Sequence, residues 1–192
     1  MSSQSSEMGE VRIIGGDWRG RKLPVLQAEG LRPTSDRVRE TLFNWLQFEV
    51  PGARCLDLFA GSGALGFEAL SRGAHHVCFL ELSADNAAQL EANATRLKCE
   101  SSEVVRTDAL RWLLEASERA FDIVFIDPPF HQGLMQPALD ALFAHHWLAE
   151  DAWLYLEQEQ DAEWPDLPEY CRLYREKTTS QVKYALFRCE VG

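Results

Sequence analysis

Apolar residues follow two different periods after residue 53, and the two periods alternate along the chain. Short apolar runs of strand length are followed by segments whose apolar residues recur every three or four positions, as on one face of a helix. The predicted strands cover residues 54–60, 75–82, 102–108, 121–127 and 152–159, and the predicted helices cover 64–73, 83–98, 109–117 and 134–147. Because such β-α units are joined by right-handed crossovers, we predict a parallel sheet with helices on both faces.

The two ends of the chain depart from this alternation. Residues 171–178 and 180–190 have strand-like patterns with no helix between them, which predicts an antiparallel hairpin. Two apolar runs flank a glycine-rich turn in residues 11–25 and predict a second hairpin. A helix that begins after Pro33 and runs to about residue 48 is predicted next. Pro33 disfavours helical conformation in the residue before it, and apolar residues then recur at helical spacing. We therefore expect a disordered tail over 1–10, a β-hairpin arm over 11–30 and one α/β domain over 31–192.

Composition and charge narrow the class of protein. Hydrophobic residues make up 46% of the 192 positions, which indicates a globular fold. No apolar run approaches the roughly 20 residues of a membrane span, and the first ten residues do not resemble a signal peptide. We expect a cytoplasmic protein without a membrane partner. The five cysteines are scattered and lack a Cys-x-x-Cys pair, so free thiols are expected, with no metal site.

The net charge of −11 taken alone argues against a nucleic-acid partner, but it is unevenly placed. Residues 11–40 contain seven Lys or Arg and four acids, so this segment carries +3 and the rest of the chain −14. A basic segment on an acidic body is an asymmetry that points to contact with nucleic acid on one side only.

Residues 61–66 read Gly-Ser-Gly-Ala-Leu-Gly, a G-x-G-x-x-G turn between a predicted strand and a predicted helix. Glycines there allow a tight turn and close approach of a ligand to the backbone, and the helix start offers free N–H groups. Glu81 ends the next strand and can accept hydrogen bonds from both ribose hydroxyls of an adenosine. An adenosine-containing cofactor is therefore predicted. Its expected contacts here are Ala60, Gly61, Ser62, Gly63, Glu81 and Leu82.

NAD and S-adenosylmethionine (AdoMet) both fit this pattern, and three details separate them. Asp57 lies inside the first strand, where a carboxylate would repel a pyrophosphate but attract the α-ammonium group of AdoMet. Asp108 closes the third strand and can accept from the adenine amino group, with Ala109 N–H donating to the ring, although Asp108 can equally cap the next helix. The Asp-Pro-Pro-Phe sequence after the fourth strand has no obvious use in a dehydrogenase. AdoMet is the predicted cofactor, with NAD as the alternative.

Asp127-Pro128-Pro129-Phe130 looks like motif IV of the AdoMet-dependent amino methyltransferases, which modify exocyclic nitrogens of adenine or guanine. Such a nitrogen is a poor nucleophile because its lone pair is delocalised into the ring. The Asp127 carboxylate and the Pro128 carbonyl can accept hydrogen bonds from its two N–H groups and draw the nitrogen towards sp³ geometry. The two prolines present these acceptors rigidly, and Phe130 can stack on a base held outside its helix. The alternative is that the two prolines only end a strand.

A wider resemblance covers about residues 11–187. The segments IIGGDWRGRKL and LRPTSDRVRETLFNWL, followed by the glycine turn and Asp-Pro-Pro-Phe, resemble the RsmD-type 16S rRNA (guanine-N2)-methyltransferases. The resemblance implies a Rossmann-like class I methyltransferase fold with a seven-stranded, mostly parallel sheet, an antiparallel last hairpin and an N-terminal hairpin that helps to hold RNA. It implies methylation of N2 of a specific guanine in 16S rRNA, within the small ribosomal subunit or its assembly intermediate, by an enzyme expected to be monomeric.

The basic segment supplies the predicted RNA contacts. Cations there can neutralise phosphates, and an aromatic residue at the turn can stack on a base. These residues are Arg12, Trp18, Arg19, Arg21, Lys22, Arg32 and Arg37, with Arg39 as a further cation. Trp18 can instead pack on the body, and some arginines can pair with Asp36 or Glu40. Thr34 can contact the cofactor or cap its helix, and the sequence does not separate the two.

Three other functions stay open at the level of sequence. Asp-Pro-Pro-Phe also permits an N6-adenine methyltransferase acting on DNA or RNA. The glycine turn also permits an NAD-dependent oxidoreductase. A non-catalytic RNA-binding assembly factor could keep the same fold.

Overall fold

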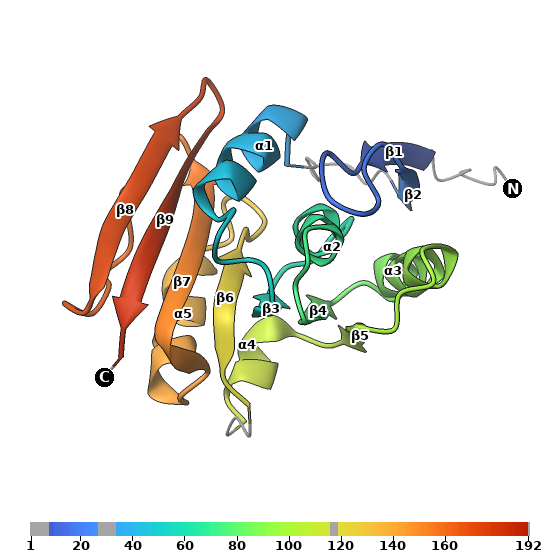
Figure 1. The fold of residues 1–192 in the computed structure, drawn as a ribbon. Coiled ribbons are helices and arrows are strands. Elements are labelled where there is room, and N and C mark those ends of the chain that lie inside the picture. Colours follow the sequence, from blue (N-terminus) through green and yellow to red (C-terminus); the bar gives the residue numbers. More distant parts are fainter. Residues whose placement is uncertain (1–7, 27–33, 116–118, 192) are drawn as a thin grey trace, which may run out of the picture.

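The computed structural model describes residues 8–26, 34–115 and 119–191, which form two sheets and the helices around them (Figure 1). The strands are β1 (Met8–Arg12), β2 (Lys22–Leu26), β3 (Arg54–Asp57), β4 (His76–Glu81), β5 (Ser102–Arg106), β6 (Phe121–Ile126), β7 (Leu148–Glu159), β8 (Cys171–Thr178) and β9 (Val182–Glu190). The helices are α1 (Asp36–Trp45), α2 (Ala64–Ser71), α3 (Ala84–Arg96), α4 (Ala109–Leu113) and α5 (Met135–Ala144).

The large sheet has seven strands in the order β5-β4-β3-β6-β7-β9-β8. Neighbouring strands from β5 to β7 are parallel, and β9 runs antiparallel to both β7 and β8. The predicted mostly parallel sheet with an antiparallel last hairpin is confirmed. The chain builds outward from β3 in one direction and from β6 in the other, so the order reverses between these two strands. In such sheets ligands bind outside the carboxyl ends of the strands at this reversal.

Helices cover both faces of the sheet, because successive side chains of a strand point to opposite faces. In β6, Phe125 packs into a core shared with α1, α2 and α3, whereas its neighbours Val124 and Ile126 pack into a core shared with α4 and α5. This two-sided burial explains why the central strands read as almost continuous apolar runs.

The first helix starts one residue after its cap. The Ser35 hydroxyl oxygen accepts a hydrogen bond from the Val38 N–H at 3.2 Å, so Ser35 is the N-cap of α1. The neighbouring Thr34 therefore does not cap the helix, and its hydroxyl is directed elsewhere, as described below.

The N-terminal hairpin starts earlier than the sequence predicted. Residues 8–10, assigned to the tail, lie in β1 and pair with residues 24–26 of β2. Residues 1–7, the rest of the predicted tail, lie outside the described residues. The hairpin also packs on the body: Val11 and Val25 contact Ala64, and the Asn93 side chain donates a hydrogen bond to the Pro24 carbonyl at 2.9 Å. The arm is thus part of the same folded unit as the sheet.

The prediction that all five cysteines are free thiols is wrong for two of them. Cys171 and Cys189 form a disulfide, whereas Cys55, Cys78 and Cys99 are free. The physical reason is the pairing register of the last hairpin, which sets Cys171 of β8 directly opposite Cys189 of β9. Sequence spacing does not reveal that register.

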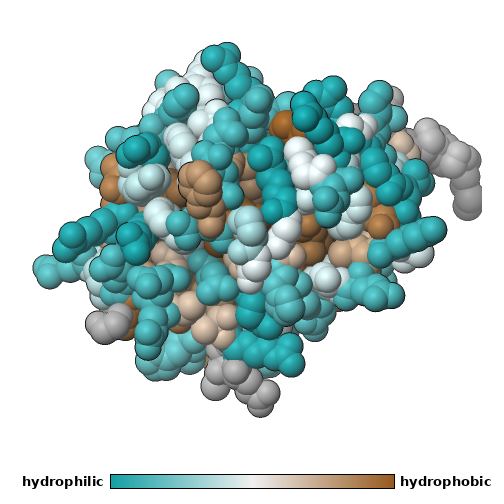
Figure 2. Space-filling view, viewed as in Figure 1, coloured by the Kyte–Doolittle hydropathy of each residue, from teal (hydrophilic) through white to brown (hydrophobic). Residues whose placement is uncertain are grey.

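The surface in view in Figure 2 is mostly hydrophilic, with apolar residues gathered in small, separate patches. Within the described ranges, no helix combines the length and the apolar character that a membrane span requires. Leu82, a strongly exposed apolar side chain, belongs to the rim of the cavity described next.

Candidate active site

A cavity of about 890 Å³ lies at the carboxyl ends of the central strands, where the strand order reverses. Such a volume suits a ligand the size of a nucleoside with an amino-acid side arm. Of the predicted cofactor and catalytic residues, all line the cavity except Gly63; those that do are Thr34, Asp57, Ala60, Gly61, Ser62, Glu81, Leu82, Asp108, Ala109, Asp127, Pro128, Pro129 and Phe130. Residues far apart in the sequence are therefore brought together as expected.

The glycines of the turn divide into two roles. Gly61 and Gly63 have φ angles of +53° and +78°, in the left-handed region that favours glycine. Gly61 lines the cavity, whereas a Cβ on Gly63 would meet Leu90 at 2.5 Å. A Cβ on Gly66 would collide with the Phe79 ring. Gly61 thus leaves room for a ligand to approach its backbone, whereas the other two glycines let α2 pack against its neighbours. Gly63 does not line the cavity, and its contact with a cofactor stays a prediction.

Asp57 ends β3 as a buried carboxyl facing the cavity. The Gly66 N–H donates a hydrogen bond to its Oδ2 at 3.2 Å. Burial raises the pKa of Asp57 to about 7, the Gly66 hydrogen bond opposes this rise, and the charge of Glu81 adds to it. A carboxyl in this position gains most from a cation that enters the cavity. The α-ammonium group of AdoMet is a cation of that kind, so this end of the cavity fits it.

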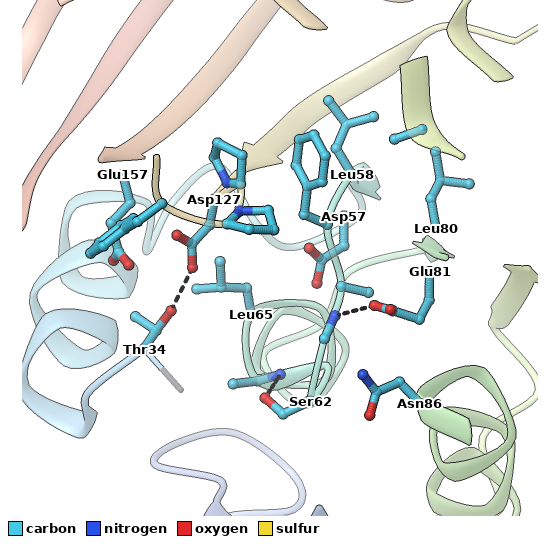
Figure 3. Close-up of a pocket in the computed structure, with 18 of the residues that line it drawn as sticks. Thr34, Asp57, Leu58, Ser62, Leu65, Leu80, Glu81, Asn86, Asp127 and Glu157 are labelled. Carbon is cyan, nitrogen blue, oxygen red and sulfur yellow. Dashed lines mark hydrogen bonds between the residues drawn. The ribbon is translucent and has the colours of Figure 1, made fainter. Parts of the chain in front are cut away.

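Glu81 and Asp108 contact the cavity from the next two strands. Glu81 accepts a hydrogen bond from the Gly61 N–H at 2.7 Å and so holds the glycine turn in place (Figure 3). It accepts a second hydrogen bond from the Ser83 N–H at 3.1 Å. Asp108 caps α4, because its Oδ1 accepts from Leu110 N–H at 2.9 Å. The cap does not decide the predicted contact with adenine, since both of its hydrogen bonds use Oδ1.

At the opposite side of the cavity, Asp127 lies between Thr34 and Glu157 (Figure 3). The Thr34 hydroxyl donates to Asp127 Oδ2 at 3.1 Å, so Thr34 contacts the predicted catalytic residue, a role that the sequence did not suggest. Glu157 of β7 lies next to Asp127 (Figure 3) and accepts a hydrogen bond from the Tyr155 hydroxyl at 2.6 Å. Burial raises the pKa of Asp127 well above its usual range, and the neighbouring Glu157 raises it further.

Sequence reasoning missed Glu157 and Tyr155. One signal was present: Glu157 is an acid inside a predicted buried strand, at the end that meets the edge of the sheet where ligands bind. Two residues farther along β7, Glu159 accepts a hydrogen bond from the His131 N–H at 2.6 Å. His131 directly follows Phe130 and has a φ of +60°, so Glu159 stabilises the end of the Asp-Pro-Pro-Phe loop in a conformation that is rare for a non-glycine residue.

The predicted RNA contacts fall into three groups. Five cations have exposed side chains on or near the arm: Arg12, Arg19, Arg21, Lys22 and Arg37. Trp18 is partly buried against the main core, as the alternative for this residue had it. Arg32 lies outside the described residues. Arg39 is wrong as a phosphate contact, because it is 1% exposed.

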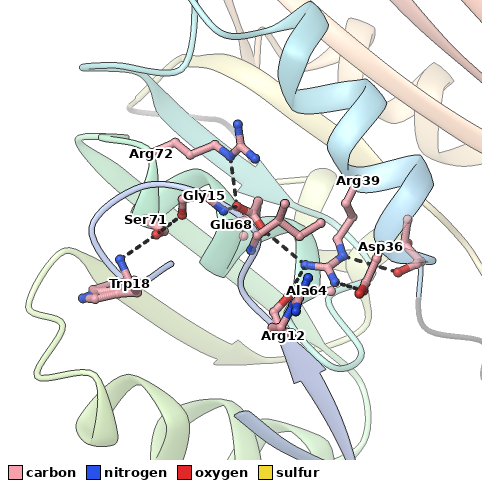
Figure 4. Close-up of polar contacts among 12 residues, drawn as sticks. Arg12, Gly15, Trp18, Asp36, Arg39, Ala64, Glu68, Ser71 and Arg72 are labelled. Carbon is pink, nitrogen blue, oxygen red and sulfur yellow. Dashed lines mark hydrogen bonds and ion pairs between the residues drawn. The ribbon is translucent and has the colours of Figure 1, made fainter. Parts of the chain in front are cut away.

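Arg39 belongs to a buried network that joins the arm to the body (Figure 4). Glu68 of α2 pairs with Arg39 at 3.1 Å and with Arg72 at 2.9 Å. The same carboxylate accepts hydrogen bonds from the N–H groups of Ile14 at 2.8 Å and Gly15 at 3.0 Å, in the turn of the arm. Glu68 therefore holds the arm beside the helix that follows the glycine turn.

Comparison with known proteins agrees with this geometry. Residues 11–188 match the family model described as Conserved hypothetical protein 95. The chain is 52% identical to "Ribosomal RNA small subunit methyltransferase D" of Haemophilus influenzae, over 94% of each chain. It is 47% identical to the protein of the same name from Escherichia coli strain K12, over 96% of this chain and 93% of the relative. A solved structure described as "Putative methyltransferase yhhF from Escherichia coli" superposes with a TM-score of 0.90 at 44% identity, covering 96% of this chain and all of that one.

Proposed function

Because the chain belongs to the ribosomal RNA small subunit methyltransferase D family, we propose that it methylates the exocyclic N2 of a specific guanine in 16S rRNA, with AdoMet as methyl donor. The protein is an AdoMet-dependent methyltransferase, so the alternative prediction of an NAD-dependent oxidoreductase is wrong. One observation carries the proposal for the site: Asp127 and the prolines after it line the same cavity as the glycine turn, across from Asp57 and Glu81.

The residues of the cavity divide the work between two ligands. When bound, AdoMet supplies a methyl group activated by its sulfonium sulfur. Asp57 attracts the ammonium group, Glu81 accepts from the ribose, and Asp108 with Ala109 borders the adenine. On the other side of the cavity, Asp127 and the Pro128 carbonyl accept hydrogen bonds from the two N–H groups of the substrate amine. Catalysis then consists mainly of positioning and polarising that amine next to the methyl group.

The N-terminal hairpin arm binds the RNA next to the cavity. Gly9, Glu10, Val25 and Leu26 of the hairpin line the cavity, while the exposed cations of the arm lie a few residues away in the chain. Phosphates bound by those cations would place a nearby base at the cavity mouth, where Phe130 can stack on it. The acidic remainder of the chain repels RNA, which favours approach from the arm side alone.

The proposed function also specifies the form of the substrate, the location of the enzyme and its oligomeric state. The substrate is the rRNA within the small subunit or its assembly intermediate, and the enzyme acts as a cytoplasmic monomer. The basic arm supports an rRNA substrate, and the choice of guanine over adenine is supported by membership of the family.

Mass spectrometry of nucleosides tests the proposal. Small subunits from a strain that lacks the protein are incubated with AdoMet and the purified enzyme, and their methylated nucleosides are identified. N2-methylguanosine is the expected product with the wild type and is not expected with Asp127→Ala. Methyladenosine as the sole product would falsify the guanine assignment, and a wild-type rate for Asp127→Ala would contradict the role of Asp127.

A further inference from the structure

Two carboxyl groups meet at one side of the cavity, and neither is needed to hold the cofactor. Asp127 follows β6, and Glu157 lies in the adjacent strand β7 with only 6% of its surface exposed. The two side chains line the same side of the cavity and lie next to each other (Figure 3). Two ionised carboxylates at such close range repel each other, and neither can donate a hydrogen bond to the other, so the pair is stable when it keeps one proton. The pair therefore holds one proton and one negative charge.

The neighbours of the pair indicate where the proton lies. The Tyr155 hydroxyl donates to Glu157 Oε1 at 2.6 Å, which favours the ionised form of Glu157. Burial raises the pKa of both carboxyl groups, but hydrogen bonds from Tyr155 and Asp127 oppose the rise at Glu157. At Asp127 the charge of Glu157 increases the rise. The Thr34 hydroxyl donates to Asp127 at 3.1 Å, a longer hydrogen bond than the one from Tyr155 to Glu157, so the shorter bond favours the charge on Glu157 and the proton on Asp127.

We propose that Glu157 is a positioning residue in the methyl-transfer reaction. The substrate amine loses a proton, and Glu157 takes up that proton through Asp127. This role rests on the proposed methyltransferase function. As the amine nitrogen bonds to the methyl carbon, the carbon–sulfur bond breaks with its electron pair on sulfur, and the positive charge moves to nitrogen. The nitrogen then gives one proton to Asp127 while Asp127 passes its own proton to Glu157. Glu157 ends as a neutral acid beside a neutral methylated base, so atoms and charge balance.

The electrostatic surroundings of the pair support a catalytic use over a purely structural one. Within the described ranges, the groups that act most strongly on the pair are Asp57 from β3, Tyr155 from β7 and the Thr34 hydroxyl, and none is a cation. A buried charge without a cationic partner is costly. The buried Glu68 of this protein, which has a structural role, is paired with two arginines. The charge of Glu157 is thus left to stabilise the positive charge that develops on the amine.

The variant Glu157→Gln tests the role, because it keeps the size of the side chain and removes the proton acceptor. The matched control is Glu150→Gln, the same substitution at the exposed far end of β7. Single-turnover methylation of unmethylated small subunits is measured with saturating AdoMet, and AdoMet affinity is measured by calorimetry. We expect transfer about 100-fold slower for Glu157→Gln, the lower end of the range for general acid–base catalysis, with AdoMet affinity within threefold of wild type. Glu150→Gln should match the wild type in both.

A measurement on the protein without ligands separates this role from simple packing. A carboxyl pair whose pKa values are raised by folding makes the protein less stable as the pH rises. The urea midpoint of the wild type should therefore fall between pH 5.5 and 8.5, and it should fall less for Glu157→Gln. A transfer rate within threefold of wild type, or a rate loss that only follows a loss of AdoMet affinity, overturns the proposal, as does an unchanged pH dependence of the midpoint.

Two further arms keep the test decisive. If Glu157→Gln does not fold, Tyr155→Phe keeps the ring and removes the hydrogen bond that holds the charge on Glu157. It should slow transfer at least tenfold, and an unchanged rate overturns the proposal. The wild type separates the two levels: if it yields no methylated nucleoside, the proposed function fails. If it does methylate and the Glu157 variant is equally fast, only the role of Glu157 fails.

Discussion

Replacing Asp57 by Asn should weaken the binding of AdoMet and, at pH 8, make the free protein more stable. The pKa of Asp57 rises from 3.8 to about 7 on folding, mainly through burial. A carboxyl with a raised pKa destabilises the fold by an amount that is absent below the unfolded value of 3.8, grows with pH and is complete above about 7. The rise corresponds to about 4 kcal/mol at pH 8, of which roughly 2 kcal/mol develops between pH 5 and pH 7.

The Asp57→Asn substitution removes this titration but leaves amide N–H groups to be buried, at a cost of about 1–3 kcal/mol. The variant should therefore be more stable than the wild type by roughly 1–3 kcal/mol at pH 8, and it should lose that advantage towards pH 5. Urea unfolding of both proteins at the two pH values measures the difference. Asp161→Asn, at an exposed position, is the control and should leave the pH dependence unchanged.

The same variant should bind AdoMet roughly 10- to 100-fold more weakly, because a hydrogen bond to a charged group contributes about 1.5–3 kcal/mol. In the wild type, AdoMet affinity should fall as the pH drops below about 7, since Asp57 must be ionised to attract the ammonium group. Calorimetry across this pH range measures both effects. Equal AdoMet affinity in the two proteins, or a stability difference that does not change with pH, would refute the reasoning.

The other predictions concern the catalytic loop, the buried network and the arm. Asp127→Asn should slow methyl transfer at least 100-fold in a single-turnover assay while AdoMet affinity changes by less than threefold; a large loss of affinity would move Asp127 to the cofactor side. Glu68→Gln should lower the free energy of unfolding by about 3–5 kcal/mol in urea, because the buried Arg39 and the partly buried Arg72 lose the charged partner that they share, and Glu49→Gln on the surface should not. Arg19→Glu with Arg21→Glu should weaken RNA binding and reduce its salt dependence without changing AdoMet affinity, and an unaltered RNA affinity at moderate salt would exclude the arm from substrate binding.

The sequence predicted those features that depend on local pattern. Two-sided burial makes the middle of β4 and of β6 apolar, and the turn at Gly61 lies where a strand period changes to a helix period, so the mostly parallel sheet and the ligand site at the glycine turn followed from general rules. Asp127 was found because its neighbours in the sequence are also its neighbours in the loop.

Features that depend on contacts between distant segments were out of reach. Glu157 lies 30 positions from Asp127, and only the parallel pairing of β6 with β7 brings them together. Arg39 looked like any other cation of the basic segment until its burial against Glu68 was visible. The bond between Cys171 and Cys189 depends on a strand register that has no signature in cysteine spacing.

The Glu68 network limits how this protein can be divided. A chain shortened to start after the hairpin would lack the two backbone N–H donors of Ile14 and Gly15, and α2 would keep a charged carboxylate built to receive them. It would also uncover Ala64 at the start of α2, which Val11 and Val25 now shield. The hairpin is consequently a poor candidate for grafting onto another methyltransferase, and removing it is a poor route to a minimal enzyme. Changes of RNA preference are better sought by exchanging the exposed side chains of the arm while its backbone stays in place.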